Sequence, residues 1–494
     1  MTPTSTVFLD RSVVPAAAPL STALLRQFDV AGPRYTSYPT ADRFVEAFDA
    51  DDYALALQGR RDAGASAAPL SLYVHIPFCE SLCYYCACNK IVTRHHEKAT
   101  QYLAYLAREV RLQVAQLGRG TTVSQLHLGG GTPTFLNDAE LSQLLDVLRE
   151  AFVFLPGGEQ SIEIDPRTVD AARLAHLASL GFNRLSFGVQ DFDPDVQRAV
   201  HREQSMESVA ALMASARELG FRSINVDLIH GLPLQTPESF ARTIEQVAML
   251  RPDRVALYGY AHLPHRFKPQ RRIDTAALPG PADKLRMLSG AIAGFIARGY
   301  SYIGMDHFAL ADDPLAVAKR EGRLHRNFQG YSTHADSDLV ALGVSAISKV
   351  GAVFAQNEKT LDAYYAALRS GRLPVERGLA LAQDDLVRRD AIMALMCQGR
   401  LAFEPIERAH GIVVSDYFTP ELERLRRLEA DGLVVIEPRA IQVTPMGWYF
   451  VRAVAMIFDR HLTQARVGAD EAMAGSDAAS TSHATASVRF SRLL

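Results

Sequence analysis

The hydrophobic positions of the chain predict an alternation of short strands and long amphipathic helices between about residues 70 and 260. Helices with one apolar face occupy the intervals, as at 102–117, 139–152 and 206–219. Strand and helix in regular turn predict a parallel sheet with helices outside, and right-handed crossovers curl such a sheet into a full or partial barrel. The predicted strands are 72–76, 125–128, 161–164, 184–187, 224–229 and 254–258.

Local signals mark where some helices begin. Asn137 stands three residues before Glu140, the spacing of a capping box, and Thr236 precedes Pro237, which suits the first position of a helix.

Other parts of the chain carry weaker patterns. Two prolines make 32–39 an ordered turn rather than a helix, and residues 265–350 are rich in turn signals. The minor expectations are a loose leader at 1–25, short helices at 41–48 and 53–63, mainly helix at 361–462 with a hairpin near 432–443, and a disordered stretch at 468–487. The predicted divisions are an N-terminal extension (1–66), a catalytic domain (67–355), a C-terminal helical domain (356–465) and a low-complexity tail (466–494).

Composition narrows the class of protein. The chain has 494 residues, 48% of them hydrophobic and 22% charged, which is typical of a globular protein of more than one domain. Its 52 basic and 55 acidic side chains give a net charge of −3, so bulk nucleic-acid binding is not expected. We also expect no membrane span and, with clustered cysteines and no secretory leader, a cytoplasmic location.

Four of the five cysteines fall within ten positions, directly after the first predicted strand. Cys79, Cys83 and Cys86 form a C-x3-C-x2-C triplet, and Cys88 follows two residues later. Thiolates this close bind one metal centre, and three of them leave one iron of an Fe–S cluster open to a small molecule. A zinc site or an electron-transfer cluster that uses Cys88 as a fourth ligand is the alternative. Cys397 lies in an apolar helix and is expected to be inert core.

Polar residues follow the other predicted strands as well. In α/β sheets, ligands bind beyond the carboxyl ends of the strands, so these residues are expected to meet at one mouth. They are the cysteines, the 129–133 segment (Gly-Gly-Gly-Thr-Pro), Glu163 and Asp165, Gln190, Asp227 and His230, and Ala261 with His262.

Each of these features has a functional and a structural interpretation. Glycines at 129–131 let a backbone approach a ligand or simply form a tight turn. The carboxylates Glu163, Asp165 and Asp227 need partners, which are either ligand hydroxyl or ammonium groups or an arginine such as Arg184 or Arg202. Tyr73 and His75 alternate along a strand and share a face. The basic residues between 265 and 272 are a candidate anchor for substrate carboxylates or a solvated face, with Arg34 and Arg326 as rival anchors.

The combination of motifs resembles the radical S-adenosylmethionine (SAM) enzymes, and more narrowly the oxygen-independent coproporphyrinogen III oxidases (coproporphyrinogen dehydrogenases) of haem biosynthesis. The resemblance covers nearly everything from about 28 to 465. The matching segments are GPRYTSYPTA at 32–41, YVHIPFC at 73–79, CNKI at 88–91, LHLGGGTPTFL at 126–136, SIEIDPR at 161–167, FGVQDF at 187–192, REQ at 202–204, DLIHGLP at 227–233, YAHLP at 260–264, GMDHFAL at 304–310, GRLHRNFQGY at 322–331 and GVSAIS at 343–348.

The resemblance implies a fold, a cofactor set and a reaction. The fold is α/β, a partial (β/α)6 barrel with an N-terminal extension and a mainly helical, winged-helix-like C-terminal domain. The cofactors are one [4Fe–4S] cluster and two SAM molecules, with Cys88 outside the ligand triplet. The reaction is the oxidative decarboxylation of two propionates of coproporphyrinogen III to vinyl groups, giving protoporphyrinogen IX, through a 5′-deoxyadenosyl radical.

Site residues and partners are carried over in the same way. Cys79, Cys83 and Cys86 correspond to the cluster ligands; Tyr73, Gly130, Glu163 and Ile347 to contacts with the first SAM; and Tyr85, Gly131, Thr132, Gln190, Arg202, Asp227 and Ala261 to contacts with the second. An electron donor such as flavodoxin or ferredoxin and a monomeric state are also implied. The rival within the superfamily is the related haem chaperone, which typically lacks a cysteine at 88 and the 34–39 segment, both present here.

Overall fold

The computed structural model describes residues 24, 27–28, 32–64, 67–328, 330–334 and 337–462. The expected loose leader lies almost wholly outside these residues, and the low-complexity tail lies wholly outside them. Contacts divide the chain into two units. The barrel unit comprises Thr40–Met287 and Ser332–Gln383, and the second unit comprises Met1–Pro39, Leu288–Tyr331 and Asp384–Leu494. The predicted domain boundaries stay predictions.

Six parallel strands form the centre of the barrel unit and neighbour one another in chain order, as predicted. Side chains on the face opposite the cavity residues, such as Val74, Leu128 and Phe187, are fully buried, as expected of a parallel sheet covered by helices. The strands are β1 (Leu70–Ile76), β4 (Thr122–Gly130), β5 (Val153–Ile164), β6 (Arg184–Gln190), β7 (Ser223–His230) and β8 (Arg254–Gly259). Every predicted strand lies within one of them.

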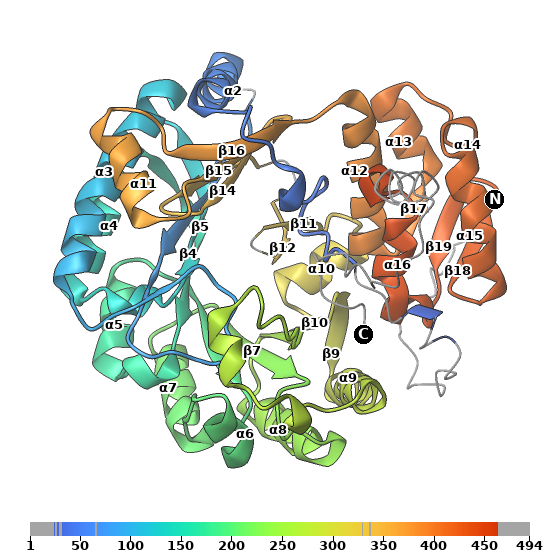
Figure 1. Cartoon of the computed structure of the whole chain (residues 1–494), viewed down its shortest axis with the longest axis horizontal. Helices are drawn as coiled ribbons and strands as arrows, with labels where there is room; N and C mark the ends of the chain where they lie inside the picture. The colour runs from blue at the N-terminus through green and yellow to red at the C-terminus, as the bar shows by residue number, and fades with distance from the viewer. Residues whose placement is uncertain are drawn as a thin grey trace, which may run out of the picture. The chain divides into compact units, whose positions relative to one another are not determined.

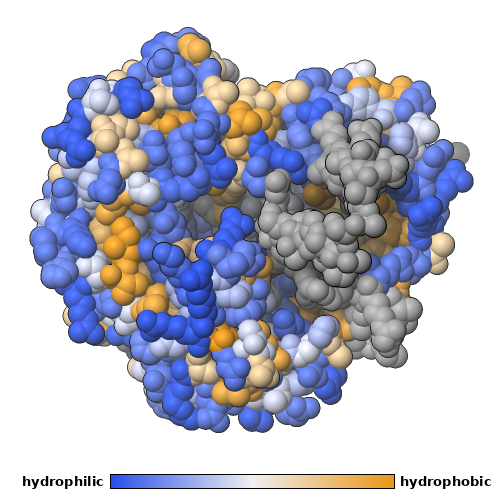
Figure 2. Space-filling model, viewed as in Figure 1, coloured by the Kyte–Doolittle hydropathy of each residue, from blue (hydrophilic) through white to orange (hydrophobic). Residues whose placement is uncertain are grey.

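Helices connect these strands and cover the outside of the sheet (Figure 1). They are α3 (Glu97–Leu117), α4 (Asp138–Ala151), α5 (Ala171–Ser179), α6 (Pro194–Ala199), α7 (Met206–Glu218), α8 (Pro237–Leu250) and, leading into the second unit, α9 (Pro281–Ile296). Both predicted helix starts are confirmed: Asn137 and Glu140 form a reciprocal capping box at 2.9 Å, and Thr236 caps α8. The side of the unit that is turned to the viewer in Figure 2 is mainly hydrophilic.

The sheet continues past β1 through strands that the sequence did not indicate. The stretch 265–350 is rich in turn signals, yet within it β13 (Leu339–Leu342) pairs in parallel with β1. Three antiparallel strands follow it, β14 (Ile347–Val350), β15 (Val353–Asn357) and β16 (Val375–Ala380), with α11 (Leu361–Arg369) between the last two. The runs were too short to stand out from turns, and their partners lie far away in the sequence.

The start of the barrel unit corrects another prediction. The helix expected at 41–48 is only a three-residue 3-10 turn, η1 (Ala41–Arg43). Val45 instead forms a β-bridge with Gly378 of β16, and the ring of Phe44 stacks on that of Phe354. Tertiary pairing therefore overrides the local helical pattern. The next helix, α2 (Ala50–Ala63), forms with an Asp49 capping box.

The second unit is mainly helical, as predicted. Its helices are α10 (Pro314–Arg320), α12 (Gln383–Gln398), α13 (Phe403–His410), α14 (Val414–Tyr417), α15 (Thr419–Ala430) and α16 (Val451–Met456). Its strands are β9 (Tyr300–Gly304) with β10 (His307–Leu310), and β11 (His325–Asn327), which pairs with β12 (Gly330–Ser332). A three-stranded sheet is formed by β17 (Arg400–Ala402), β18 (Val434–Glu437) and β19 (Ala440–Val443). The predicted hairpin near 432–443 is β18–β19. The segment 32–39 is non-helical, and both of its tyrosines, Tyr35 and Tyr38, are fully buried.

Candidate functional site

One cavity lies at the carboxyl ends of the six parallel strands and collects most of the predicted site residues. Its lining comes from the loop after β1 and from the ends of β4, β5, β6 and β7. Eleven of the fourteen residues singled out from the sequence line it: Cys79, Cys83, Tyr85, Cys86, Gly130, Gly131, Thr132, Glu163, Gln190, Arg202 and Asp227. Of the residues expected at strand ends, the cysteines, Gly130 to Pro133, Glu163, Asp165, Gln190 and Asp227 line this cavity, whereas His230, Ala261 and His262 do not.

The cysteine-bearing loop is closed at its base by a short parallel pairing. The strands β2 (Phe78–Cys79) and β3 (Ile91–Val92) pair in parallel. The amide of Ile91 donates to the carbonyl of Pro77 at 2.7 Å, and that of Thr93 to the carbonyl of Cys79 at 2.9 Å. These bonds hold the intervening residues as one loop, so that Cys79, Cys83, Cys86 and Cys88 all line the cavity.

The cysteine thiols have different surroundings. Burial raises the pKa of Cys79 to about 11, although the hydroxyl of Thr132, 3.5 Å from its Sγ, opposes that shift. A hydrogen bond from the Cys88 thiol and the nearby Lys90 ammonium lower the pKa of Cys86 to about 5. The same hydrogen bond raises the pKa of Cys88 well above its usual range. Cys86 is therefore the thiolate of the pair and Cys88 is the thiol that donates to it.

Two arginines bring positive charge to Cys83. Arg202 Nη1 lies 3.5 Å and Arg167 Nη2 3.6 Å from its Sγ, and both guanidinium groups also bind Asp165, at 3.1 and 2.7 Å. Asp165 thus follows the ion-pair interpretation, and these cations lower its pKa against the effect of burial. The alternative partner, Arg184, pairs with Glu159 instead. Cations beside sulfur stabilise thiolate, the form in which cysteine binds a metal.

Glu163 has no arginine or lysine partner among the described residues. One carboxylate oxygen accepts from the Gly130 amide at 3.1 Å, and the other lies 3.4 Å from His127 Nε2. The ring of His127 stacks on that of Tyr73, with ring centroids 5.9 Å apart. A carboxylate held mainly by neutral groups at the wall of a cavity retains acceptor capacity for a ligand.

Two hydrogen bonds of His75 link β1 to the end of the cysteine loop. His75 Nε2 lies 3.0 Å from the Asn89 carbonyl oxygen, which only accepts, so this nitrogen carries the proton. Nδ1 then accepts from the Tyr73 hydroxyl at 3.0 Å. Burial lowers the pKa of His75, so the ring is neutral. Tyr73 and His75 do share a face, as predicted, and the pair fixes the loop relative to the strand.

Asp227 is the other carboxylate at the cavity without a cation partner among the described residues. Ser186 donates to it at 2.9 Å, and Asn225 donates to its second oxygen at 2.9 Å. Burial, and then repulsion from Glu163, raise its pKa to about 6. Two carboxylates that repel each other in a cavity favour a ligand that brings hydroxyl or ammonium donors.

The glycine run meets a packing requirement and also lines the cavity. A Cβ atom at Gly130, whose φ is +117°, would approach His75 to 2.7 Å, and one at Gly131 would approach the Phe78 carbonyl oxygen to the same distance. The close approach of β4 to the cysteine loop therefore requires glycine at both positions. The tight-turn and ligand-contact interpretations are compatible, because both residues also face the cavity.

Three residues carried over from the resemblance lie outside the cavity lining. Tyr73 contacts His75 and His127 behind it. Ile347 opens β14, and the carbonyl of Ala261 accepts from Gln270 at 3.1 Å. Their assignment to SAM contacts stays a prediction.

The structure also adds residues that the sequence reasoning did not single out. Lys90 and Ser186 line the cavity, and Arg167 and Asn225 hold Asp165 and Asp227 in place. Two of them could have been found from the sequence, because residues two apart in a strand point to the same face. Ser186 and Asn225 lie two positions before Gly188 and Asp227 in β6 and β7.

Comparison with known proteins gives the family. Residues 73–247 match the model of the Radical SAM superfamily, and residues 381–450 match that of the HemN C-terminal domain. The chain is 52% identical to the oxygen-independent coproporphyrinogen III oxidase of Escherichia coli K12 over 442 residues, 90% of this chain and 95% of that protein. It is 50% identical to the enzyme of that name from Pseudomonas aeruginosa over 441 residues, 89% of this chain and 95% of that protein.

This chain belongs to the family of oxygen-independent coproporphyrinogen III oxidases. The family carries the radical SAM fold, and the solved E. coli coproporphyrinogen III oxidase (HemN), described as a radical SAM enzyme, superposes with a TM-score of 0.84 at 50% identity. The superposition covers 90% of this chain and 99% of that one. The family assignment and the fold class predicted from the sequence are thus confirmed. Radical SAM membership implies a [4Fe–4S] cluster and SAM. Of the helices that the structure describes, none has the length and apolarity needed to cross a membrane.

Proposed function

We propose that this chain catalyses the oxygen-independent oxidative decarboxylation of two propionate side chains of coproporphyrinogen III to vinyl groups, which gives protoporphyrinogen IX. Each propionate loses one hydrogen atom, one electron and CO2. The observation that carries the proposal is the convergence of Cys79, Cys83 and Cys86 on one cavity with Glu163 and Asp227, two carboxylates without an arginine or lysine partner among the described residues. The relatives named above support the substrate.

The cavity residues fit the cofactors of the family. Cys79, Cys83 and Cys86 would hold the [4Fe–4S] cluster, since their thiols line one cavity and cations lie beside two of them. By its correspondence to the family motifs, Cys88 lies outside the ligand triplet. When bound, the reduced cluster and SAM supply a carbon-centred radical that removes a hydrogen atom from an unactivated carbon.

The chain's own groups would bind and orient SAM. Glu163 offers its free acceptor capacity to an ammonium group, and Asp227 offers its oxygens to a hydroxyl pair. We assign Tyr73, Gly130, Glu163 and Ile347 to a first SAM, and Tyr85, Gly131, Thr132, Gln190, Arg202, Asp227 and Ala261 to a second, by their correspondence to the family motifs. The count of two rests on that correspondence.

The remaining partners complete the proposal. Cluster reduction needs a one-electron donor such as flavodoxin or ferredoxin. All five cysteines are free, as a reducing cytoplasm would keep them, and we propose a cytoplasmic monomer.

An anaerobic assay tests the function directly. Reconstituted protein, a reductant, SAM, an electron acceptor and coproporphyrinogen III should give protoporphyrinogen IX, CO2 and 5′-deoxyadenosine, separated by chromatography. Cys83→Ser should abolish all three products, whereas Cys397→Ala, a matched change at a buried cysteine of the second unit, should not. Cleavage of SAM without decarboxylation would indicate a different radical reaction. Tight haem binding without turnover would indicate a chaperone.

A further inference from the structure

A run of exposed cations follows β8 and lies against the cysteine-bearing loop. It comprises His265, Arg266, Lys268, Arg271 and Arg272, here called the basic segment, and every one of these side chains is exposed. The sequence left two interpretations open, an anchor for substrate carboxylates and an ordinary solvated face. The structure favours a third.

The basic segment is held rigidly by one buried side chain. Gln270, only 1% exposed, donates from Nε2 to the carbonyl of Tyr85 at 2.9 Å and to that of Ala261 at 3.1 Å. Its Oε1 accepts from the Leu263 amide at 2.6 Å. Because Tyr85 lies between Cys83 and Cys86, the segment is fastened directly to the loop that would hold the cluster.

A small aromatic platform lies between the basic segment and the cysteines. The guanidinium of Arg272 stands over the ring of Tyr84, 5.3 Å from its centroid. The ring of His201 stacks on the same tyrosine, with centroids 5.2 Å apart, and its Nδ1 donates to the Leu82 carbonyl at 2.8 Å. Tyr85 lines the cavity, but Tyr84, His201 and Arg272 do not, so they cover another side of the loop.

The charges of the segment are largely uncompensated. Lys268, Arg271 and Arg272 form no ion pair with any described residue, and Arg271 donates only to the Pro264 carbonyl. Neighbouring surface arginines differ, since Arg198 pairs with Asp195. Unpaired cations fixed on one face create a positive field that attracts an acidic partner and speeds its association.

We propose that the basic segment and the Tyr84 platform form the docking surface for an acidic protein that carries one electron. This inference rests on the proposed function, which requires an external reductant. In the transfer, the donor is oxidised by one electron and the cluster site is reduced by one, with no bond made or broken. The surface fits this role because it is positive, rigid and directly next to the cysteines. Substrate carboxylates are the weaker alternative, because no residue of the basic segment lines the cavity.

The test compares two reductants on the cluster-loaded enzyme. A Lys268→Glu, Arg271→Glu variant should raise the KM for reduced plant-type ferredoxin about tenfold and flatten its dependence on salt, because charge reversal acts on steered association. Its turnover with dithionite, a small reductant that needs no docking, should stay within about twofold of wild type. The matched control is Arg111→Glu, Arg119→Glu, which makes the same charge change at two exposed residues of α3 and the turn after it.

Calorimetric binding of ferredoxin adds a measurement that does not depend on turnover. The basic-segment variant should lose binding, and the control variant should keep it. An unchanged ferredoxin KM and dissociation constant would overturn the proposal. A raised KM for coproporphyrinogen III with both reductants would overturn it in favour of a substrate anchor. If wild type is inactive with dithionite, the proposed function fails, while the binding result still decides whether the surface docks an acidic protein.

Discussion

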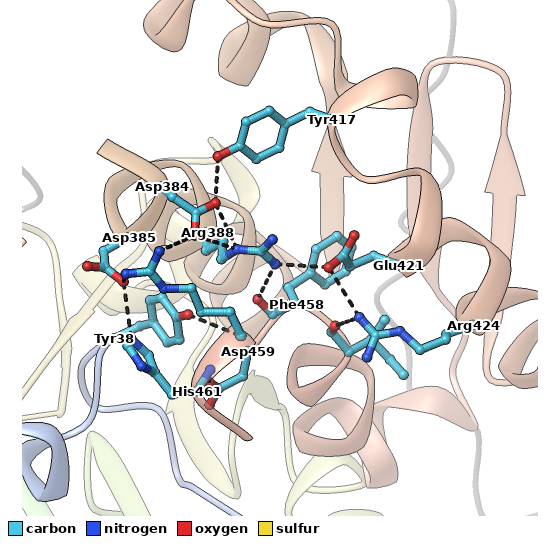
Figure 3. A network of polar contacts seen from close by, with 12 residues as sticks. Tyr38, Asp384, Asp385, Arg388, Tyr417, Glu421, Arg424, Phe458, Asp459 and His461 are labelled. Atoms are coloured by element: carbon cyan, nitrogen blue, oxygen red, sulfur yellow. Dashed lines mark hydrogen bonds and ion pairs between the residues drawn. The ribbon is translucent and has the colours of Figure 1, made fainter. Parts of the chain in front are cut away.

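The two units of the chain each contain a cluster of charged residues, and the two clusters differ in how their charges are paired. In the second unit, Arg388 and Arg424 (Figure 3), together with Arg460, form ion pairs with three carboxylates. The carboxylate partners are Asp384, with Arg388 at 2.9 Å and Arg460 at 2.7 Å; Asp385, with Arg460 at 2.9 Å; and Glu421, with Arg388 at 3.0 Å and Arg424 at 3.1 Å. Each of these three carboxylates has a guanidinium partner.

In the cavity of the barrel unit only Asp165 is paired in this way. Glu163 and Asp227 have no arginine or lysine partner among the described residues, and burial and repulsion from Glu163 raise the pKa of Asp227 to about 6. Complete pairing within a network supports the fold, whereas carboxylates left without cations at a cavity cost stability and are retained for a ligand. The contrast distinguishes a structural network from a binding site without reference to any relative.

The largest effect on stability should come from breaking the paired network. Arg388→Met leaves Asp384 and Glu421 with one guanidinium fewer each and should lower the free energy of unfolding by about 3 kcal/mol. Turnover per folded molecule should not change, because Arg388 lies in the second unit, outside the cavity. Urea unfolding and anaerobic turnover at a temperature where both proteins are folded measure the two. A loss of turnover without a loss of stability would contradict the structural role.

Neutralising a cavity carboxylate that has no cation partner should lower turnover and raise the stability of the protein without SAM. Asp227→Asn should lower turnover at limiting SAM about 10- to 100-fold, since hydrogen bonds to a charged group contribute about 1.5–3 kcal/mol. Without SAM, the variant should be more stable than wild type by about 1–3 kcal/mol at pH 8.

The pH dependence gives this prediction a sign. Because the folded pKa of Asp227 is raised from 3.8 to about 6, the folded protein binds more protons than the unfolded chain between those values. The loss of folding stability caused by ionised Asp227 is therefore absent below about pH 4. It grows as pH rises through this window and is complete above pH 6. Urea unfolding at pH 4.5 and pH 8 should show a stability gap that is clearly wider at pH 8. A gap that narrows with rising pH would refute the charge-based account.

The smallest effect on stability should come from breaking an ion pair whose two side chains are both exposed to solvent. Arg408→Ala removes the contact with Glu404 on α13, where both side chains are more than two-thirds exposed. The free energy of unfolding should fall by only about 0.3–0.5 kcal/mol. A cost comparable to that of Arg388→Met would show that pairing alone, rather than pairing in a buried network, determines the contribution.

The sequence was sufficient to predict the barrel and the mouth where its residues meet. Short apolar runs separated by amphipathic helices located all six strands, and position at a strand end placed Glu163 and Asp227 together. The sequence did not reveal which carboxylate is paired, because Asp165 meets Arg202 only when β5 and the segment after β6 come together in space. The sequence pattern also did not indicate β13, because these four residues form a strand only by pairing with β1, more than 250 residues earlier.

The central claim is that three cysteines, with Cys88 excluded, hold an iron–sulfur cluster open to SAM. Iron and sulfide analysis combined with electron paramagnetic resonance of the reduced protein, before and after addition of SAM, tests it most directly. The account predicts about four irons per chain in both wild type and Cys88→Ser, and a spectrum that shifts when SAM is added. Loss of iron in Cys88→Ser, together with a wild-type spectrum that SAM does not change, would contradict it.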